Sequence, residues 1–264
     1  GSAYGRTALD SEAATGAAYF DNDAARTGHA VGRGRHAARF TGASREQVHA
    51  YASYCMLMGV FGRRRAVARY AQRAAYAAQQ FGDPGGLAHA RLYEAIAIHY
   101  CGESAAGEVQ SRRCLEEYGR WLDVKDFQNG CISLAWNLFI RGYAEEALRW
   151  VERALGRSEH TRAQPDLSIG HLDRAMAGAI LASLGRSAEG REDVMRFQTG
   201  AADRPRDAYR WGIFLETVVL FHTEAGELGA ALDDAIAQHA RLGLQPATAE
   251  FHLRLFFIFQ AYAR

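Results

Sequence analysis

Residues Arg141–Leu155 read RGYAEEALRWVERAL, and this stretch sets the expectation for the whole fold. Gly142 interrupts a helical pattern, Ala147 follows five residues later, and Ala154 and Leu155 close the segment. A glycine ends a helix at low cost because it adopts the left-handed conformation that other residues avoid. A small residue near the turn lets two helices cross closely. The stretch therefore predicts the turn and the second helix of an antiparallel helix pair.

The pattern recurs along the chain with a period of about 40 residues, which indicates a repeat architecture. Successive glycines at the breaks differ in residue number by 40, 40, 43 and 41: Gly62, Gly102, Gly142, Gly185 and Gly226. Successive prolines differ by 81, 40 and 41: Pro84, Pro165, Pro205 and Pro246. Proline suits the first turn of a helix because its φ is fixed and its missing N–H is not needed there. Two residue types thus indicate one period of repeated helix pairs, which must stack because no single pair can bury its apolar face.

Between these marks the apolar residues recur at helical spacing, and strand patterns are essentially absent. The predicted helix pairs are 6–20 with 23–41, 44–60 with 63–81, 84–101 with 104–121, 124–141 with 143–157, 166–184 with 187–199, and 206–225 with 227–242, followed by a last helix at 247–263. We expect an all-α fold, a right-handed α-solenoid of about six helix pairs plus a trailing helix, as one domain over residues 1–264. Gly1 and Ser2 are expected to be the remnant of a tag, and both ends to have been cut from a longer protein.

The segment around Gly142 resembles the tetratricopeptide repeat. It has the glycine, a small residue at +5, an apolar one at +9, and Ala-Leu at +12 and +13: Gly142, Ala147, Val151, Ala154 and Leu155. The resemblance covers nearly the whole chain, although other repeats match less closely and the period exceeds the usual ~34 residues. Long-period arrays of this kind look like those of large bacterial regulators, such as transcription factors of the maltose-activator class, signal-transducing NTPases and peptide-pheromone receptors. The resemblance implies a non-catalytic protein- or peptide-recognition or effector-sensing module of a bacterial cytoplasmic regulatory or signalling protein.

The resemblance also implies a binding groove lined by the first helix of each pair. Positions six and three residues before the break glycines usually face such a groove, and neighbouring polar residues orient the ligand. The expected groove residues are Met56, Ile96, His99, Trp136, Asn137, Phe139 and Arg141. An apolar and aromatic groove suits an extended peptide or a helix with hydrophobic anchors, and a small effector is the other expected ligand. Ordinary packing in the core is the alternative role for each of these side chains.

A basic stripe lies in the segment Phe61–Tyr76, which reads FGRRRAVARYAQRAAY. Arg65, Arg69 and Arg73 stand at i,i+4 spacing, and we expect them to contact an acidic partner unless they form a solvated outer face. Residues 1–80 carry 11 basic and 5 acidic residues, but the chain has a net charge of +1. Nucleic acid is therefore not an expected partner.

No motif in the sequence indicates catalysis, a cofactor or a metal. The stretch GRGRH at 32–36 lacks a following Gly-Lys, and Lys125 is the only lysine, so a phosphate-binding loop is excluded. The histidines form no HExxH motif. Two alternatives remain open: an enzyme with His99 and Glu94 or Glu103 as acid–base partners, and a scaffold that self-assembles through the open ends of the solenoid.

Two further patterns concern the cellular compartment and the membrane. The four cysteines are scattered without a CxxC motif, which favours a reducing cytoplasm: Cys55, Cys101, Cys114 and Cys131. No window approaches 18 uninterrupted apolar residues, so no membrane partner is expected.

Overall fold

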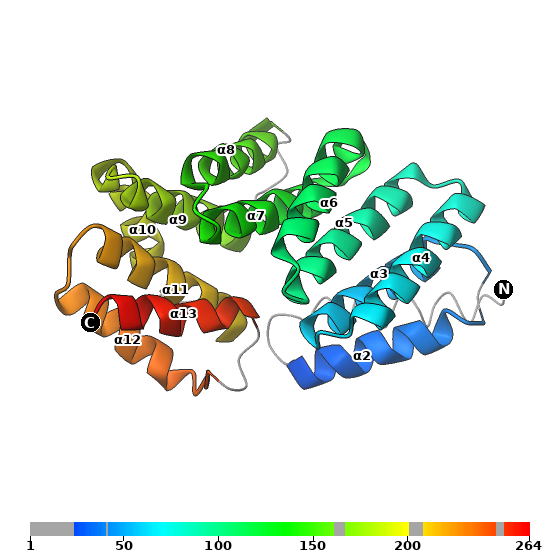
Figure 1. Cartoon of the computed structure of the whole chain (residues 1–264), viewed down its shortest axis with the longest axis horizontal. Coiled ribbons are helices and arrows are strands. Elements are labelled where there is room, and N and C mark those ends of the chain that lie inside the picture. The colour runs from blue at the N-terminus through cyan, green and yellow to red at the C-terminus, as the bar shows by residue number, and fades with distance from the viewer. Residues whose placement is uncertain (1–23, 41, 161–166, 201–207, 247–250) are drawn as a thin grey trace. The chain divides into compact units, whose positions relative to one another are not determined.

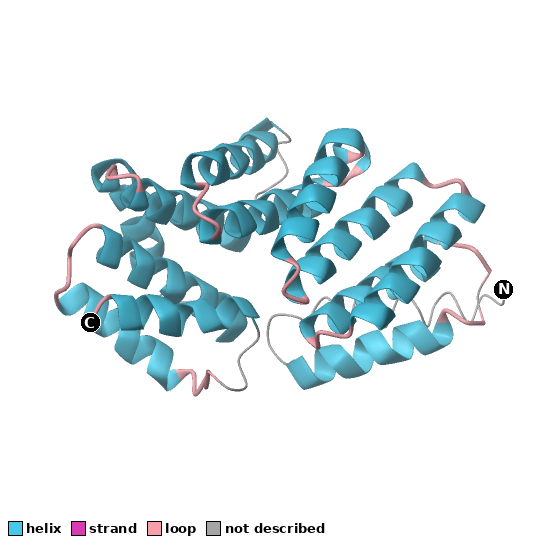
Figure 2. Cartoon of the chain, viewed as in Figure 1, coloured by secondary structure: helices cyan, strands magenta, loops and turns pink. Residues whose placement is uncertain are grey.

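The computed structural model describes residues 24–40, 42–160, 167–200, 208–246 and 251–264. Over these residues the chain forms twelve α-helices, one 3-10 helix and no strand (Figure 2). The prediction of an all-α fold is confirmed for this part of the chain. The predicted helix at 6–20 lies outside the described residues.

The chain divides into two compact units, residues 1–137 and 138–264, with the boundary inside one helix. The first unit contains α2 (Ala24–Ala37), α3 (Arg45–Val60), α4 (Arg64–Phe81), α5 (Pro84–Tyr100), α6 (Ser104–Glu117), the 3-10 helix (Gly119–Trp121) and most of α7 (Val124–Ile140). The second contains α8 (Ala144–His160), α9 (Leu167–Ser183), α10 (Ser187–Gly200), α11 (Ala208–Glu224), α12 (Ala230–Arg241) and α13 (Phe251–Tyr262) (Figure 1). Every helix predicted from 23–41 onward therefore has an observed counterpart.

The break glycines adopt the conformation that the sequence predicts. All five have φ between +65° and +87°, and they follow α3, α5, α7, α9 and α11. At Gly142 the N–H donates to the carbonyl of Phe139 at 2.9 Å, and the Tyr143 N–H donates to Leu138 at 2.9 Å. These two bonds satisfy carbonyls that the end of a helix leaves without a partner. A left-handed glycine thus closes the first helix of each described pair.

Of the two prolines among the described residues, one marks a helix start. Pro84 begins α5, as predicted. Pro246 lies in a turn, and Pro165 and Pro205 lie outside the described residues.

The small residues five positions after the break glycines lie at close helix crossings. A Cβ atom added to Gly107 in α6 would lie 3.0 Å from the Cβ of His99 in α5. A Cβ added to Gly190 in α10 would lie only 2.4 Å from the Cα of Gly178 in α9. The last pair differs, because α12 begins only at Ala230 and buries Leu232 while Ala231 stays partly exposed. Where the turn is longer, the crossing position moves along by one residue.

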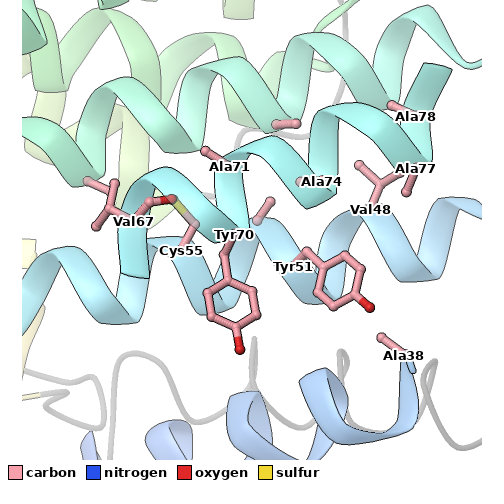
Figure 3. Close-up of a cluster of buried hydrophobic side chains, with 13 residues drawn as sticks. Ala38, Val48, Tyr51, Cys55, Val67, Tyr70, Ala71, Ala74, Ala77 and Ala78 are labelled. Carbon is pink, nitrogen blue, oxygen red and sulfur yellow. The ribbon is translucent and has the colours of Figure 1, made fainter. Parts of the chain in front are cut away.

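The core of the first unit is built largely from alanine, which lets α3, α4 and α5 approach closely. Figure 3 shows the alanines of α4 facing Val48 and Cys55 of α3. The Cys55 thiol donates to the carbonyl of Val67 at 3.5 Å, which joins the two helices of this pair.

The first helices of successive pairs also contact one another inside each unit. Helix α3 contacts both α4 and α5, and α5 contacts α4 and α6. In the second unit α9 contacts α8, α10 and α11, and α11 contacts α12 and α13. These are the contacts that stacked helix pairs require. None of the described helices combines the length and the apolar character needed to cross a membrane.

Candidate functional site

The structure places most of the predicted groove residues in the interior. Ile96, His99, Trp136 and Asn137 are buried, whereas Met56 and Phe139 are half-buried and Arg141 is exposed. The side-chain amide of Asn137 donates to the carbonyl of Ser104 at 2.8 Å. Met56 in the first unit, and Phe139 and Arg141 in the second, keep exposed surface, and the groove stays a prediction.

His99 and the two carboxylates considered as its partners are engaged separately. His99 lies against Gly107 at the crossing of α5 and α6 and is 1 % exposed. Glu94 pairs with Arg91 at 2.8 Å, and Glu103 pairs with Arg64 at 2.8 Å. Neither carboxylate is among the groups that shift the pKa of His99, which burial lowers to about 4.

Burial of His99 predicts a loss of stability at mildly acidic pH. Because the pKa of His99 is lower in the folded chain than in the unfolded chain, its contribution to stability is fully present above pH 6.5. As the pH falls from 6.5 toward 4, the unfolded chain binds a proton that the folded chain does not, and this contribution is lost. Between pH 7 and pH 5 we expect His99 to account for about 2 kcal/mol of lost unfolding free energy. Urea denaturation of the unmodified chain and of His99→Gln at both pH values measures this, and equal pH slopes for the two would contradict it.

The predicted stripe Arg65, Arg69 and Arg73 is exposed on α4, and Arg73 leads to a larger arrangement around Tyr70. The guanidinium group of Arg73 lies 5.3 Å from the centroid of the Tyr70 ring. Arg35, which comes from α2, donates from Nη1 to the Tyr70 hydroxyl at 3.0 Å, and its guanidinium carbon lies 4.9 Å from the centroid of the Tyr54 ring. Figure 3 shows Tyr70 and Tyr51 extending from α4 and α3 toward α2.

The electrostatics of Tyr70 reflect these arginines. Burial would raise the pKa of Tyr70, but the hydrogen bond from Arg35 and the charges of Arg35 and Arg73 outweigh it, and Arg39 lowers the pKa further. The pKa of Tyr70 therefore lies below the usual tyrosine value. Beside α2, a hollow of about 530 Å³ has a described lining that includes Arg33, Arg35, His29 and His36 and no carboxylate.

A second arrangement, which we call the histidine cluster, joins α3, α5 and α7 in the first unit. The rings of His49 and His89 lie with centroids 4.0 Å apart, and Tyr93 lies 4.2 Å from His89. The Nδ1 of His89 lies 2.6 Å from Oδ2 of Asp126, and both side chains are buried. The backbone N–H of Asp126 donates to Oδ1 of Asp123 at 2.8 Å, which caps the start of α7.

Burial dominates the proton affinities in the histidine cluster. It lowers the pKa of His49 to about 4, with the neighbouring His89 as the next cause. It raises the pKa of Tyr93 well above the usual value. Burial would also raise the pKa of Asp126, but the hydrogen bond and charge of His89 hold it below its usual value. The cluster therefore contains an ionised carboxylate that accepts the Nδ1–H of His89.

Chemically, such a pair can orient the other imidazole nitrogen as a proton acceptor. The Nε2 of His89, however, is enclosed and has no hydrogen-bond partner among the described residues. Within the same residues, no group of three or more histidine, cysteine or acidic side chains is arranged to hold a metal ion. The arrangement thus supports a role in joining three helices.

The repeat period of the sequence contains a signal for this cluster, although no catalytic or metal-binding motif does. His49 and His89 differ by 40 in residue number, which is one repeat period, and each stands at the same offset before a break glycine, Gly62 or Gly102. Equivalent positions in successive first helices come together when the pairs stack, so the repeat period itself predicts that two histidines in this register meet.

No family model, no curated protein and no solved structure matches the chain.

Proposed function

We propose that the chain is a non-catalytic recognition module, built as a tetratricopeptide-like right-handed solenoid, that binds a protein or peptide segment. It would belong to a bacterial cytoplasmic regulatory or signalling protein. Stacked helix pairs offer a long preformed surface. Because this surface is already ordered, little conformational entropy of the module is lost when an extended segment binds.

The observation that carries the proposal is the recurrence of one hairpin plan. Five break glycines, spaced at the repeat period, close helices in the same left-handed conformation, and first helices pack on the next first helices within each unit. A scaffold assembled in this way exposes one edge of every pair, and repeat proteins use such edges for extended partners.

Selection of peptides from a random displayed library on the full folded chain tests the proposal. We expect a recurring peptide motif, and synthetic copies should bind saturably with one peptide per chain by titration calorimetry. Panning on the urea-unfolded chain is the control, because it removes peptides that bind any exposed apolar segment. Failure of every enriched peptide to bind the folded chain, or chemical conversion of a bound peptide, would overturn the proposal.

A further inference from the structure

Charge is distributed very unevenly in the first unit. Residues 24–82 contain one acidic residue, Glu46, and ten arginines: Arg26, Arg33, Arg35, Arg39, Arg45, Arg63, Arg64, Arg65, Arg69 and Arg73. Helices α2 and α4, which both belong to this segment, carry no aspartate or glutamate. A surface of this composition attracts anions strongly at short range.

Tyr70 lies among three of these arginines, of which one is in α2, one follows α2 and one is in α4. Its hydroxyl accepts from Arg35 of α2 at 3.0 Å, and Arg73 of α4 lies over its ring. Arg39, which follows α2, is also among the groups that lower the pKa of Tyr70. We call Arg35, Arg39 and Arg73 the arginine face. Both Arg39 and Arg73 are exposed, so a ligand can reach them directly.

Among the residues that the structure describes, no carboxylate is paired with Arg35. The hydrogen bond to Tyr70 is the largest effect that raises the pKa of Arg35, and burial opposes it. The charges of Tyr70, Tyr54 and Tyr51 also raise this pKa, and all three groups are phenols and not carboxylates. Its Nε is buried without a hydrogen-bond partner among the described residues. Elsewhere the chain pairs its arginines with glutamates, as Arg64 with Glu103 and Arg113 with Glu117. Around Tyr70 the phenol takes the place of such a carboxylate.

We propose that the arginine face binds an acidic segment of a partner protein, whose aspartate or glutamate carboxylates accept hydrogen bonds from Arg35, Arg39 and Arg73. Planar guanidinium groups present paired donors that match a carboxylate, which lysine does not offer. The inference rests on the proposed function, because it names the chemistry of the segment that the recognition module takes. The exposed Arg65 and Arg69 continue the positive charge along α4.

A short acidic peptide fits these observations better than a nucleic acid. The aromatic rings at the face are covered, since Tyr51 and Tyr70 are buried and Tyr54 lies beneath Arg35, so they offer no platform on which bases stack. The excess of positive charge is also confined to residues 24–82, because 29 of the 30 acidic residues lie outside this segment and the whole chain has a net charge of +1. A long polyanion would therefore gain little beyond the face.

Fluorescence anisotropy with the full chain tests the inference. The probe is a fluorescein-labelled twelve-residue peptide of alternating glutamate and serine, and its counterpart with glutamine in place of glutamate is the uncharged control. We expect saturable binding of the acidic peptide that weakens as salt is raised. The triple variant Arg35→Gln, Arg39→Gln and Arg73→Gln should bind at least tenfold more weakly. The matched variant Arg149→Gln, Arg241→Gln and Arg264→Gln, which removes the same charge elsewhere, should bind as the unmodified chain does.

Two further comparisons make every outcome decisive. If the glutamine variant does not fold, Arg35→Lys, Arg39→Lys and Arg73→Lys keeps the charge and should still weaken binding several-fold. A twelve-nucleotide single-stranded oligonucleotide that binds more tightly than the peptide would overturn the inference. The inference would also be overturned if the acidic peptide bound only after Asp10, Glu12, Asp21 and Asp23 had been changed to their amides. That result would mean that the chain's own acidic residues occupy the arginine face. If peptides selected from the displayed library bind the triple glutamine variant as tightly as the unmodified chain, the inference fails while the proposed function stands.

Discussion

Gly190→Ala is expected to lower the unfolding free energy by about 3 kcal/mol, a large effect for a single methyl group. The added Cβ would lie 2.4 Å from the Cα of Gly178 and 2.7 Å from its carbonyl oxygen. Both are backbone atoms, so no side-chain rotation can relieve the contact, and α9 and α10 must move apart. Separation would also disturb Val194, a fully buried residue at the same crossing.

The same substitution at Gly156 is the matched control. Gly156 lies within α8 of the same unit, and a Cβ added there meets nothing within 4 Å. Alanine favours the helix more than glycine does, so Gly156→Ala should raise stability by about 0.5 to 1 kcal/mol. Urea denaturation followed by circular dichroism measures both variants, and a Gly190→Ala chain as stable as the unmodified one would show that the crossing is not as close as described.

Asp126→Ala is expected to lower the unfolding free energy by about 3 kcal/mol as well, because it removes one partner of a buried pair and leaves the other without compensation. His89 would lose the acceptor that lies 2.6 Å from its Nδ1. The exposed Asp233, changed to alanine, is the control and should shift stability by no more than about 0.5 kcal/mol.

The effect of Asp126→Ala should depend on pH in a defined direction. The pKa of Asp126 is lower in the folded chain, so its charge contributes stability above the ordinary aspartate range, and this contribution is lost as the pH falls through the lowered pKa. The stability difference between the two chains should therefore be full at pH 7 and shrink in acid. A difference that grows on acidification would contradict an ionised carboxylate in the histidine cluster.

The helix ends were predictable because they depend on local backbone chemistry. Gly62, Gly102 and Gly142 take positive φ wherever a first helix stops, and Pro84 begins the helix that the proline spacing predicts. These preferences act within a few residues and are visible in one dimension.

The site was harder to predict because burial depends on which face of each helix meets its neighbours. The position of His99 was expected to face a groove, yet Gly107 lets α6 come so close that His99 is enclosed at the crossing. Arg35 and Tyr70 are 35 residues apart, and no motif relates them until α2 and α4 approach across α3. His49 and His89 fall between these cases, since their separation by one repeat period was available in the sequence.

A left-handed glycine ends the first helix of each described pair, and five single alanine substitutions measure what this conformation requires. Gly62, Gly102, Gly142, Gly185 and Gly226 all have positive φ, and a Cβ added at any of them meets nothing within 4 Å. Only backbone strain then opposes alanine, and it should cost about 1 kcal/mol at every site. Urea denaturation should show five similar losses, opposite in sign to the gain at Gly156→Ala. A gain in stability at any of the five would contradict a single hairpin plan repeated along the chain.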